Sequence, residues 1–234
     1  MTDIIPSKDF KDLIGTETKP VLIDVFGAGC APCVWMSPVI DALAEDLKDE
    51  ARIVKLDRDE ARANGGKDNP VVKFLADNKI QGIPAMLLFD KGELKGALMG
   101  GPHAKAEVRG WMEKKLGSAF NAAAAPKTLA RYGIVIDNLP EDMNKMWDAA
   151  GDLYDKVTTA ALPFFATDDA RGVSMGPIDA DKKLRGVCVD MTAEAAQAVA
   201  TALPEEKLVD ASGKRVEPAQ KPKTPFFCVD DPAP

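Results

Sequence analysis

The chain has 234 residues and a net charge of −7, and 46% of its residues are hydrophobic and 29% charged. This composition excludes disorder throughout, and at roughly 100 to 200 residues per domain the length suggests two compact units or one large one. An acidic chain without a basic cluster argues against nucleic acid as a partner, and apolar runs as short as 86–89 argue against a membrane partner.

The first 117 residues alternate between helix and strand patterns. Ser7 is the predicted N-cap of the first helix, and Pro38 is expected to kink the second one. Alternating strands and helices predict parallel crossovers, and a closing hairpin adds an antiparallel edge, so the fold class is α/β with a mixed sheet of four or five strands. The elements are expected as helices at 7–14, 32–47, 71–78 and 106–116, strands at 21–26 and 52–59, a loop at 63–70 and a hairpin over 85–100.

The second half is predicted to be a smaller α+β domain at 131–234 with an irregular C-terminal tail, joined by an Ala-rich linker at 118–130. It carries no catalytic constellation, so we expect a module for partner binding or dimerisation, with an unrecognised catalytic domain as the alternative. The expected elements are strands at 132–137 and 183–191, helices at 140–160 and 192–203, and a hairpin at 210–214.

Four cysteines are too few for a disulfide-stapled scaffold, but Cys30 and Cys33 form a C-x-x-C motif where a strand passes into a helix. Unpaired N–H groups and the positive end of the helix dipole favour a thiolate there, so Cys30 is the candidate nucleophile. Cys33, about one turn later, is the candidate resolving thiol. Pro32 suits the first helical turn, where its missing N–H costs nothing.

Two other interpretations of the cysteine pair are open. Zinc needs four ligands, but the sequence has no second C-x-x-C and His103 is its only histidine. Two structural core cysteines could also share this spacing by chance. The strand-to-helix position favours redox chemistry over both, and we expect no metal and no cofactor besides a Cys30–Cys33 redox-active disulfide.

Residues 1–117 resemble thioredoxin. The resemblance extends through VLIDVFGAGCAPC, Pro38 five residues after Cys33, the KLD that closes the second strand, and GIPAMLLFDKGE followed by MGG. It implies the thioredoxin fold and a protein-disulfide reductase. Its substrates would be proteins with disulfides, and its own disulfide would be reduced by a flavoenzyme of the thioredoxin-reductase type. The stretch GPIDADKKLRGVCVDMTAEAAQAVA resembles small, dimeric, ferredoxin-like domains of the YCII-related type, which implies a homodimer through the second domain.

The resemblance also implies residue roles. Asp24 would be the buried proton acceptor beneath the cysteines, and Lys55 would pair with it. An ionised carboxylate inside an apolar strand is costly, so its pKa should rise toward neutrality; the alternative is an Asp24 that faces water. Pro84 would follow a cis peptide bond and offer backbone pairing to a substrate peptide. The substrate-contacting residues would be Gly29, Ala31, Pro32, Ile83, Pro84 and Gly100.

Three positions depart from the family pattern. Gly29 stands where a tryptophan is usual, Ala31 replaces a glycine, and Val34 replaces a lysine or arginine. The redox potential and substrate preference therefore do not carry over. These departures favour a second hypothesis, a non-catalytic thioredoxin-fold binding or assembly protein that acts through its C-terminal domain.

The remaining expectations concern location and isolated residues. The segment MTDIIPSKDF has neither a basic nor an apolar signal region, which predicts a cytoplasmic protein. Cys188 is expected to be a buried small hydrophobe, and Cys228 an accessible residue of the tail. Trp35, Trp111 and Trp147 are predicted to be packing residues.

Overall fold

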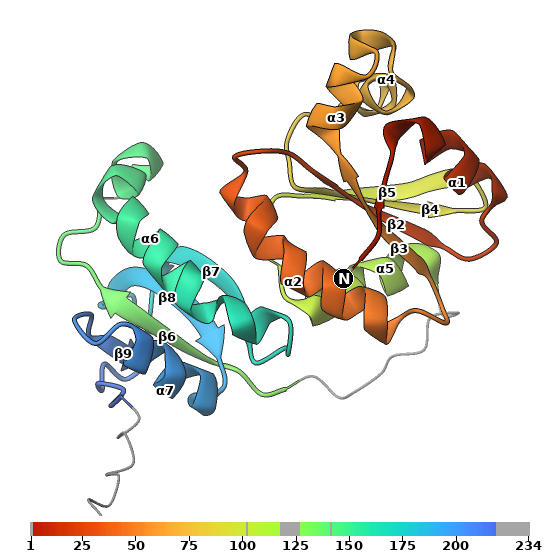
Figure 1. The fold of residues 1–234 in the computed structure, drawn as a ribbon. Coiled ribbons are helices and arrows are strands. Elements are labelled where there is room, and N and C mark those ends of the chain that lie inside the picture. Colours follow the sequence, from red (N-terminus) through yellow and green to blue (C-terminus); the bar gives the residue numbers. More distant parts are fainter. Residues whose placement is uncertain (1, 102, 118–126, 141, 219–234) are drawn as a thin grey trace, which may run out of the picture.

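The computed structural model describes residues 2–101, 103–117, 127–140 and 142–218 of the chain. These residues build two β-sheets, each with its own helices (Figure 1). Residues 118–126 are outside the described residues, so the predicted linker at 118–130 and the domain boundaries stay predictions. The predicted tail and Cys228 are outside them as well.

The first sheet has five strands in the order β1-β3-β2-β4-β5. β1, β3 and β2 run parallel, and β4 and β5 add an antiparallel edge. The strands are β1 (Ile4–Ile5), β2 (Val21–Phe26), β3 (Arg52–Asp57), β4 (Ala85–Asp90) and β5 (Glu93–Met99). The helices are η1 (Ser7–Asp9), α1 (Phe10–Thr16), α2 (Ala31–Asp46), α3 (Arg58–Ala63), η2 (Gly66–Asp68), α4 (Pro70–Asp77) and α5 (Lys105–Leu116). This arrangement confirms the α/β class and the thioredoxin fold.

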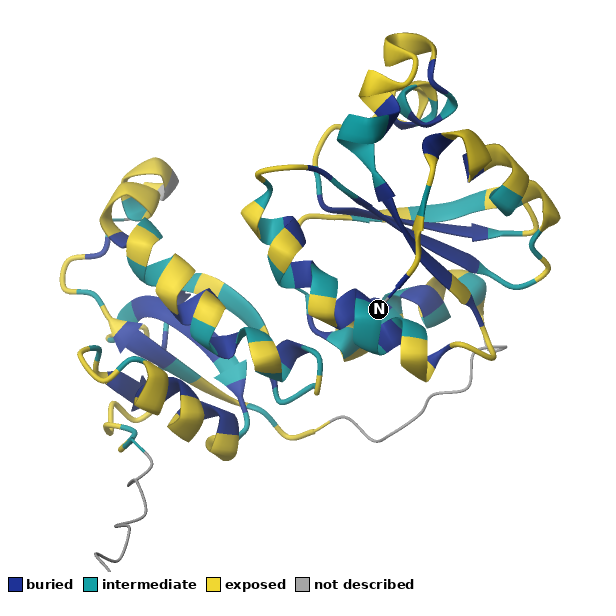
Figure 2. Cartoon of the chain, in the orientation of Figure 1, coloured by how far each residue is buried: buried dark blue, intermediate teal, exposed yellow. Residues whose placement is uncertain are grey.

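The sheet is covered on both faces, which is why β2 is apolar along almost its whole length. Leu22 and Met86 pack with α2 and α5 on one face, whereas Ile23 and Leu87 pack with α1 and α4 on the other. Figure 2 shows the central strands buried and the outer sides of the helices exposed. The carboxyl end of β2 is therefore packed on both faces where the chain turns into α2.

The second sheet has four antiparallel strands in the order β7-β8-β6-β9. With two helices, the chain order is β-α-β-β-α-β, which is the topology of the ferredoxin-like domains that the second half resembles. The elements are β6 (Ala130–Val135), α6 (Met143–Phe165), β7 (Ala170–Pro177), β8 (Arg185–Met191), α7 (Ala193–Ala202) and β9 (Leu208–Asp210).

Several local predictions were wrong. β7 was missed, because a bulge between Arg171 and Ser174 and two glycines interrupt its alternation. Ser7 is not an N-cap: it lies buried inside η1, and its hydroxyl accepts a hydrogen bond from Asn69 Nδ2 at 3.0 Å. The loop predicted at 63–70 contains η2, and α6 extends five residues beyond the predicted helix end at 160.

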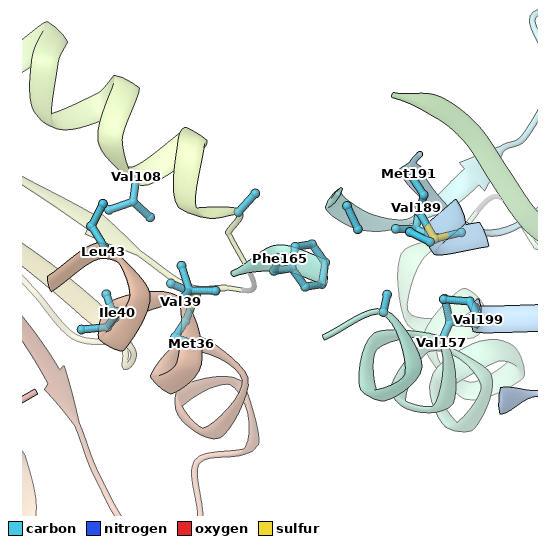
Figure 3. Close-up of a cluster of buried hydrophobic side chains, with 14 of the residues drawn as sticks. Met36, Val39, Ile40, Leu43, Val108, Val157, Phe165, Val189, Met191 and Val199 are labelled. Atoms are coloured by element: carbon cyan, nitrogen blue, oxygen red, sulfur yellow. The ribbon is translucent and has the colours of Figure 1, made fainter. Parts of the chain in front are cut away.

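The two parts of the chain share one buried cluster (Figure 3). Phe165, at the end of α6, has no exposed surface and lies between Met36 and Val39 of α2 on one side and Val189 and Met191 of β8 on the other. A few residues later, the Asp168 carboxylate accepts a hydrogen bond of 2.6 Å from the Ala106 N–H in the first turn of α5. The part of the chain that holds the second sheet is thus packed, through α6, against the helix that carries the cysteine pair.

Candidate active site

The cysteine pair lies at the start of α2, just after the turn that follows β2. Cys30 is the N-cap of α2, and it forms a disulfide with Cys33, with the two Cα atoms 5.2 Å apart. The Cys33 N–H donates to Cys30 Sγ at 3.2 Å, so the first turn of the helix directs a donor at the outer sulfur. Cys30 is half-buried, whereas Cys33 is only 6% exposed. This difference in access matches the predicted division between an attacking and a resolving thiol.

Asp24 lies on β2 beneath the helix and is 1% exposed, so the water-facing alternative is wrong. Its neighbours across the sheet are Lys55 on β3 and Met86 on β4. The Oδ1 atom is buried and forms no hydrogen bond with the described residues. Burial raises the pKa of this carboxyl to about 6, with Lys55 lowering it and Asp41 raising it further. A carboxyl with this pKa can both accept and release a proton near neutrality.

Lys55 is buried, but its ammonium does not reach Asp24 as a direct partner. It forms an ion pair of 2.8 Å with Asp41 and donates a hydrogen bond of 2.7 Å to the Ser37 hydroxyl. Ser37 and Asp41 are one turn apart on α2, so one face of the helix holds the ammonium. Burial acts to raise the pKa of Asp41, but hydrogen bonds from Lys55 and Thr2 outweigh it and bring the value to about 2. Lys55 therefore acts on Asp24 only through its charge, across space, and the two residues do not form the expected direct ion pair.

The loop that precedes β4 forms the other side of the site. The Ile83–Pro84 peptide bond is cis, as the resemblance implied. The Gly100 N–H donates to the Pro84 carbonyl at 2.9 Å, which joins this loop to the end of β5. A β-carbon at Gly101 would lie 2.9 Å from Met36 Cγ, so a glycine here allows the loop after β5 to approach α2 closely.

The turn before Cys30 is anchored by a residue that sequence reasoning missed. The Asp59 carboxylate, just after β3, accepts a hydrogen bond of 2.8 Å from the Ala28 N–H. Gly29 has a φ of +69°, a conformation that side chains rarely adopt, and open space lies where its β-carbon would be. The absent tryptophan therefore leaves the approach to Cys30 uncovered on this side.

The structure brings the predicted catalytic residues together around one hollow. Asp24, Lys55, Cys30 and Cys33 all line a cavity of about 690 Å³, together with Gly29 and Ala31. Ile83, Pro84 and Gly100 do not line this cavity, and Pro32 does not either. Ser37 and Asp41 line the cavity without having been predicted, and Asp59 holds the turn before Cys30 from outside the cavity. The i, i+4 spacing of Ser37 and Asp41 on α2 was the one signal in the sequence that could have found two of them.

Other sites are less prominent among the described residues. Within them, no cluster of three or more His, Cys, Asp or Glu side chains could hold a metal ion, and no helix is long and apolar enough to span a bilayer. Cys188 is buried at 1% exposure, as predicted, and burial raises its pKa to about 11. Trp147, predicted to be a packing residue, packs on Tyr154, although its side chain is 45% exposed.

A thioredoxin fold with a cysteine pair at the N-terminus of α2 defines the class of this protein. Comparisons with known proteins agree: the thioredoxin family model matches residues 2–114. The thioredoxin of Porphyra purpurea is 31% identical over 96 residues, which are 41% of this chain and 80% of the relative. The thioredoxin of Rickettsia prowazekii is 28% identical over 116 residues, 50% of this chain and 100% of the relative. Chloroplastic thioredoxin Y1 of Arabidopsis thaliana is 33% identical over 84 residues, 36% of this chain and 43% of its own length.

The chain therefore belongs to the thioredoxin family. Its first half, with the Cys30–Cys33 disulfide, supports activity as a thiol–disulfide oxidoreductase. The family match ends at residue 114, before the second sheet begins at Ala130.

Proposed function

We propose that this protein reduces disulfides in other proteins through the Cys30-Ala31-Pro32-Cys33 dithiol. The observation that carries the proposal is the position of the pair: Cys30 caps α2, and both sulfurs share a cavity with the buried Asp24 carboxyl. In the reduced protein, the helix N-terminus favours a thiolate at Cys30.

The reaction proceeds in two exchanges. The Cys30 thiolate attacks one sulfur of the substrate disulfide, an S–S bond forms to that sulfur, and the other substrate sulfur leaves as a thiolate. Cys33 then gives its proton to the Asp24 carboxylate and attacks Cys30 Sγ. The Cys30–Cys33 disulfide forms, the second substrate thiolate leaves, and two electrons have passed to the substrate.

The surrounding residues support these steps. Lys55, fixed by Asp41, lowers the pKa of Asp24 without occupying its carboxylate. We propose that Ile83, Pro84 and Gly100 bind the substrate backbone, with Gly29 and Ala31 at its disulfide. A flavoenzyme of the thioredoxin-reductase type would supply the electrons that restore the dithiol, in a reducing compartment for which the cytoplasm is our proposal.

The test is an insulin-reduction assay driven by dithiothreitol, with wild type, Cys30→Ser and Cys33→Ser compared. Wild type should be much faster than either variant. Cys33→Ser should also accumulate a mixed disulfide at Cys30 that mass spectrometry detects, because the resolving thiol is absent. A wild type no faster than Cys30→Ser would contradict the proposal.

For the second domain we propose partner binding, with a second copy of the chain as the partner. An aromatic pair supports this: Trp147 on α6 is 45% exposed and packs edge-to-face on Tyr154, with ring centroids 5.0 Å apart. Light scattering should show a dimer for wild type and a monomer for Trp147→Ala. A monomeric wild type would contradict the proposed dimer.

A further inference from the structure

The cavity beside the disulfide has an apolar mouth. Ile4 on β1 is 61% exposed and Val34 on α2 is 67% exposed, and both line it. They are two of the five large hydrophobic side chains that are exposed among the described residues. Single exposed hydrophobic residues are common, but here two of them flank the same hollow as the reactive sulfurs.

The charged groups in this cavity offer no free cation. The Lys55 ammonium is held by Asp41 at 2.8 Å and by the Ser37 hydroxyl at 2.7 Å. The remaining charged group is Asp24, whose carboxyl has a buried and unpartnered oxygen. When ionised, it repels an anion. When neutral, it can donate a hydrogen bond to a neutral ligand such as an amide.

The wall of the cavity indicates which molecule enters it. Cys30 and Cys33 both belong to the lining, so an occupant lies next to the bond that exchanges. The peptide-binding loops implied by the family resemblance, at Pro84 and Gly100, are not part of the lining. A group in this cavity would therefore approach the sulfurs from a different side than a peptide paired with those loops.

We propose that this cavity is a second substrate subsite, which takes an uncharged, apolar group carried next to the disulfide of the substrate. The inference rests on the proposed reductase function. Exchange follows the same two steps. The Cys30 thiolate bonds to one substrate sulfur and the other leaves as a thiolate; Cys33 then attacks Cys30 Sγ, which forms the Cys30–Cys33 disulfide and releases the second substrate thiolate. Disulfides that carry carboxylates next to the sulfurs are discriminated against.

Single-turnover kinetics of the pre-reduced, full-length protein provide the test. The two probes are the neutral dibutylamide of dithiodipropionic acid and the dithiodipropionate dianion, which share the same carbon chain beside the sulfurs. Wild type should reduce the neutral probe about tenfold faster, and Ile4→Ser and Val34→Ser should each lower that rate about fivefold, a change expected from losing part of one apolar contact. With the dianion, the rate of each variant should stay within about twofold of the wild-type rate.

The matched control is Val135→Ser, which changes an exposed valine on β6 and should alter neither rate. The dibutylamide of suberic acid, which has methylenes in place of both sulfurs, should slow reduction of the neutral probe by competition. Equal wild-type rates for the two probes, or variants that slow both alike, would overturn the subsite. If wild type and Cys30→Ser reduce both probes equally slowly, the proposed function itself fails.

Discussion

Replacing Asp24 with asparagine removes a carboxyl group that folding buries almost completely, at 1% exposure. Its pKa is raised from 3.8 to about 6, mainly by burial. Because the folded protein holds this proton more tightly than the unfolded chain, the contribution to stability is present below pH 3.8 and is lost as the pH rises through about 6. At about 1.4 kcal/mol for each factor of ten in proton affinity, the loss amounts to about 3 kcal/mol.

The assay is urea unfolding of the oxidised protein from about pH 4 to pH 8, followed by tryptophan fluorescence. The free energy of unfolding of Asp24→Asn should rise relative to wild type by more than about 2 kcal/mol over this range, since asparagine does not ionise. Asp49→Asn, at an exposed position, is the matched control and should track wild type. Parallel curves for wild type and Asp24→Asn would refute the reasoning.

Three further predictions address neighbouring features. Lys55→Met removes a charge that lowers the pKa of Asp24, so the pKa of this carboxyl should rise. In a plot of the rate of mixed-disulfide resolution against pH, the acid limb should therefore move to higher pH. A limb that does not move would contradict the through-space interaction. Phe165→Ala should cost about 3 kcal/mol in unfolding free energy, whereas the half-buried neighbour Phe164→Ala should cost less, and equal losses would contradict the interdomain packing. Cys188, with a pKa of about 11, should resist iodoacetamide at about pH 8 until the protein is denatured, as mass mapping of the native protein would show.

Much of the first domain was predictable because its signals are local. The apolar run at 21–26, the C-x-x-C and the turn at Lys91-Gly92 each report on a few adjacent residues. Both turn residues have positive φ, as a tight hairpin requires. The burial of Asp24 could be predicted as well, because a carboxylate within the apolar run of a central strand lies between residues that are themselves buried.

The features that were missed depend on contacts between distant residues. The expected Asp24–Lys55 pair is replaced by an ion pair with Asp41, which depends on how α2 lies over β3. The packing of α6 against α2 could not be predicted, because the apolar pattern of a helix does not show which other helix it packs against. β7 was hidden because its bulge and glycines suppress the alternation by which strands are recognised.

The central claim is that Cys30, at the N-terminus of α2, is the attacking thiolate and Cys33 the shielded resolving thiol. Timed alkylation of the fully reduced protein with iodoacetamide at neutral pH, with each cysteine quantified by peptide mass spectrometry, tests it most directly. We expect Cys30 to react at least about tenfold faster than Cys33, and the ratio of the Cys30 rate to the Cys188 rate to be larger again. Equal rates at the three positions, or Cys33 reacting first, would contradict the account.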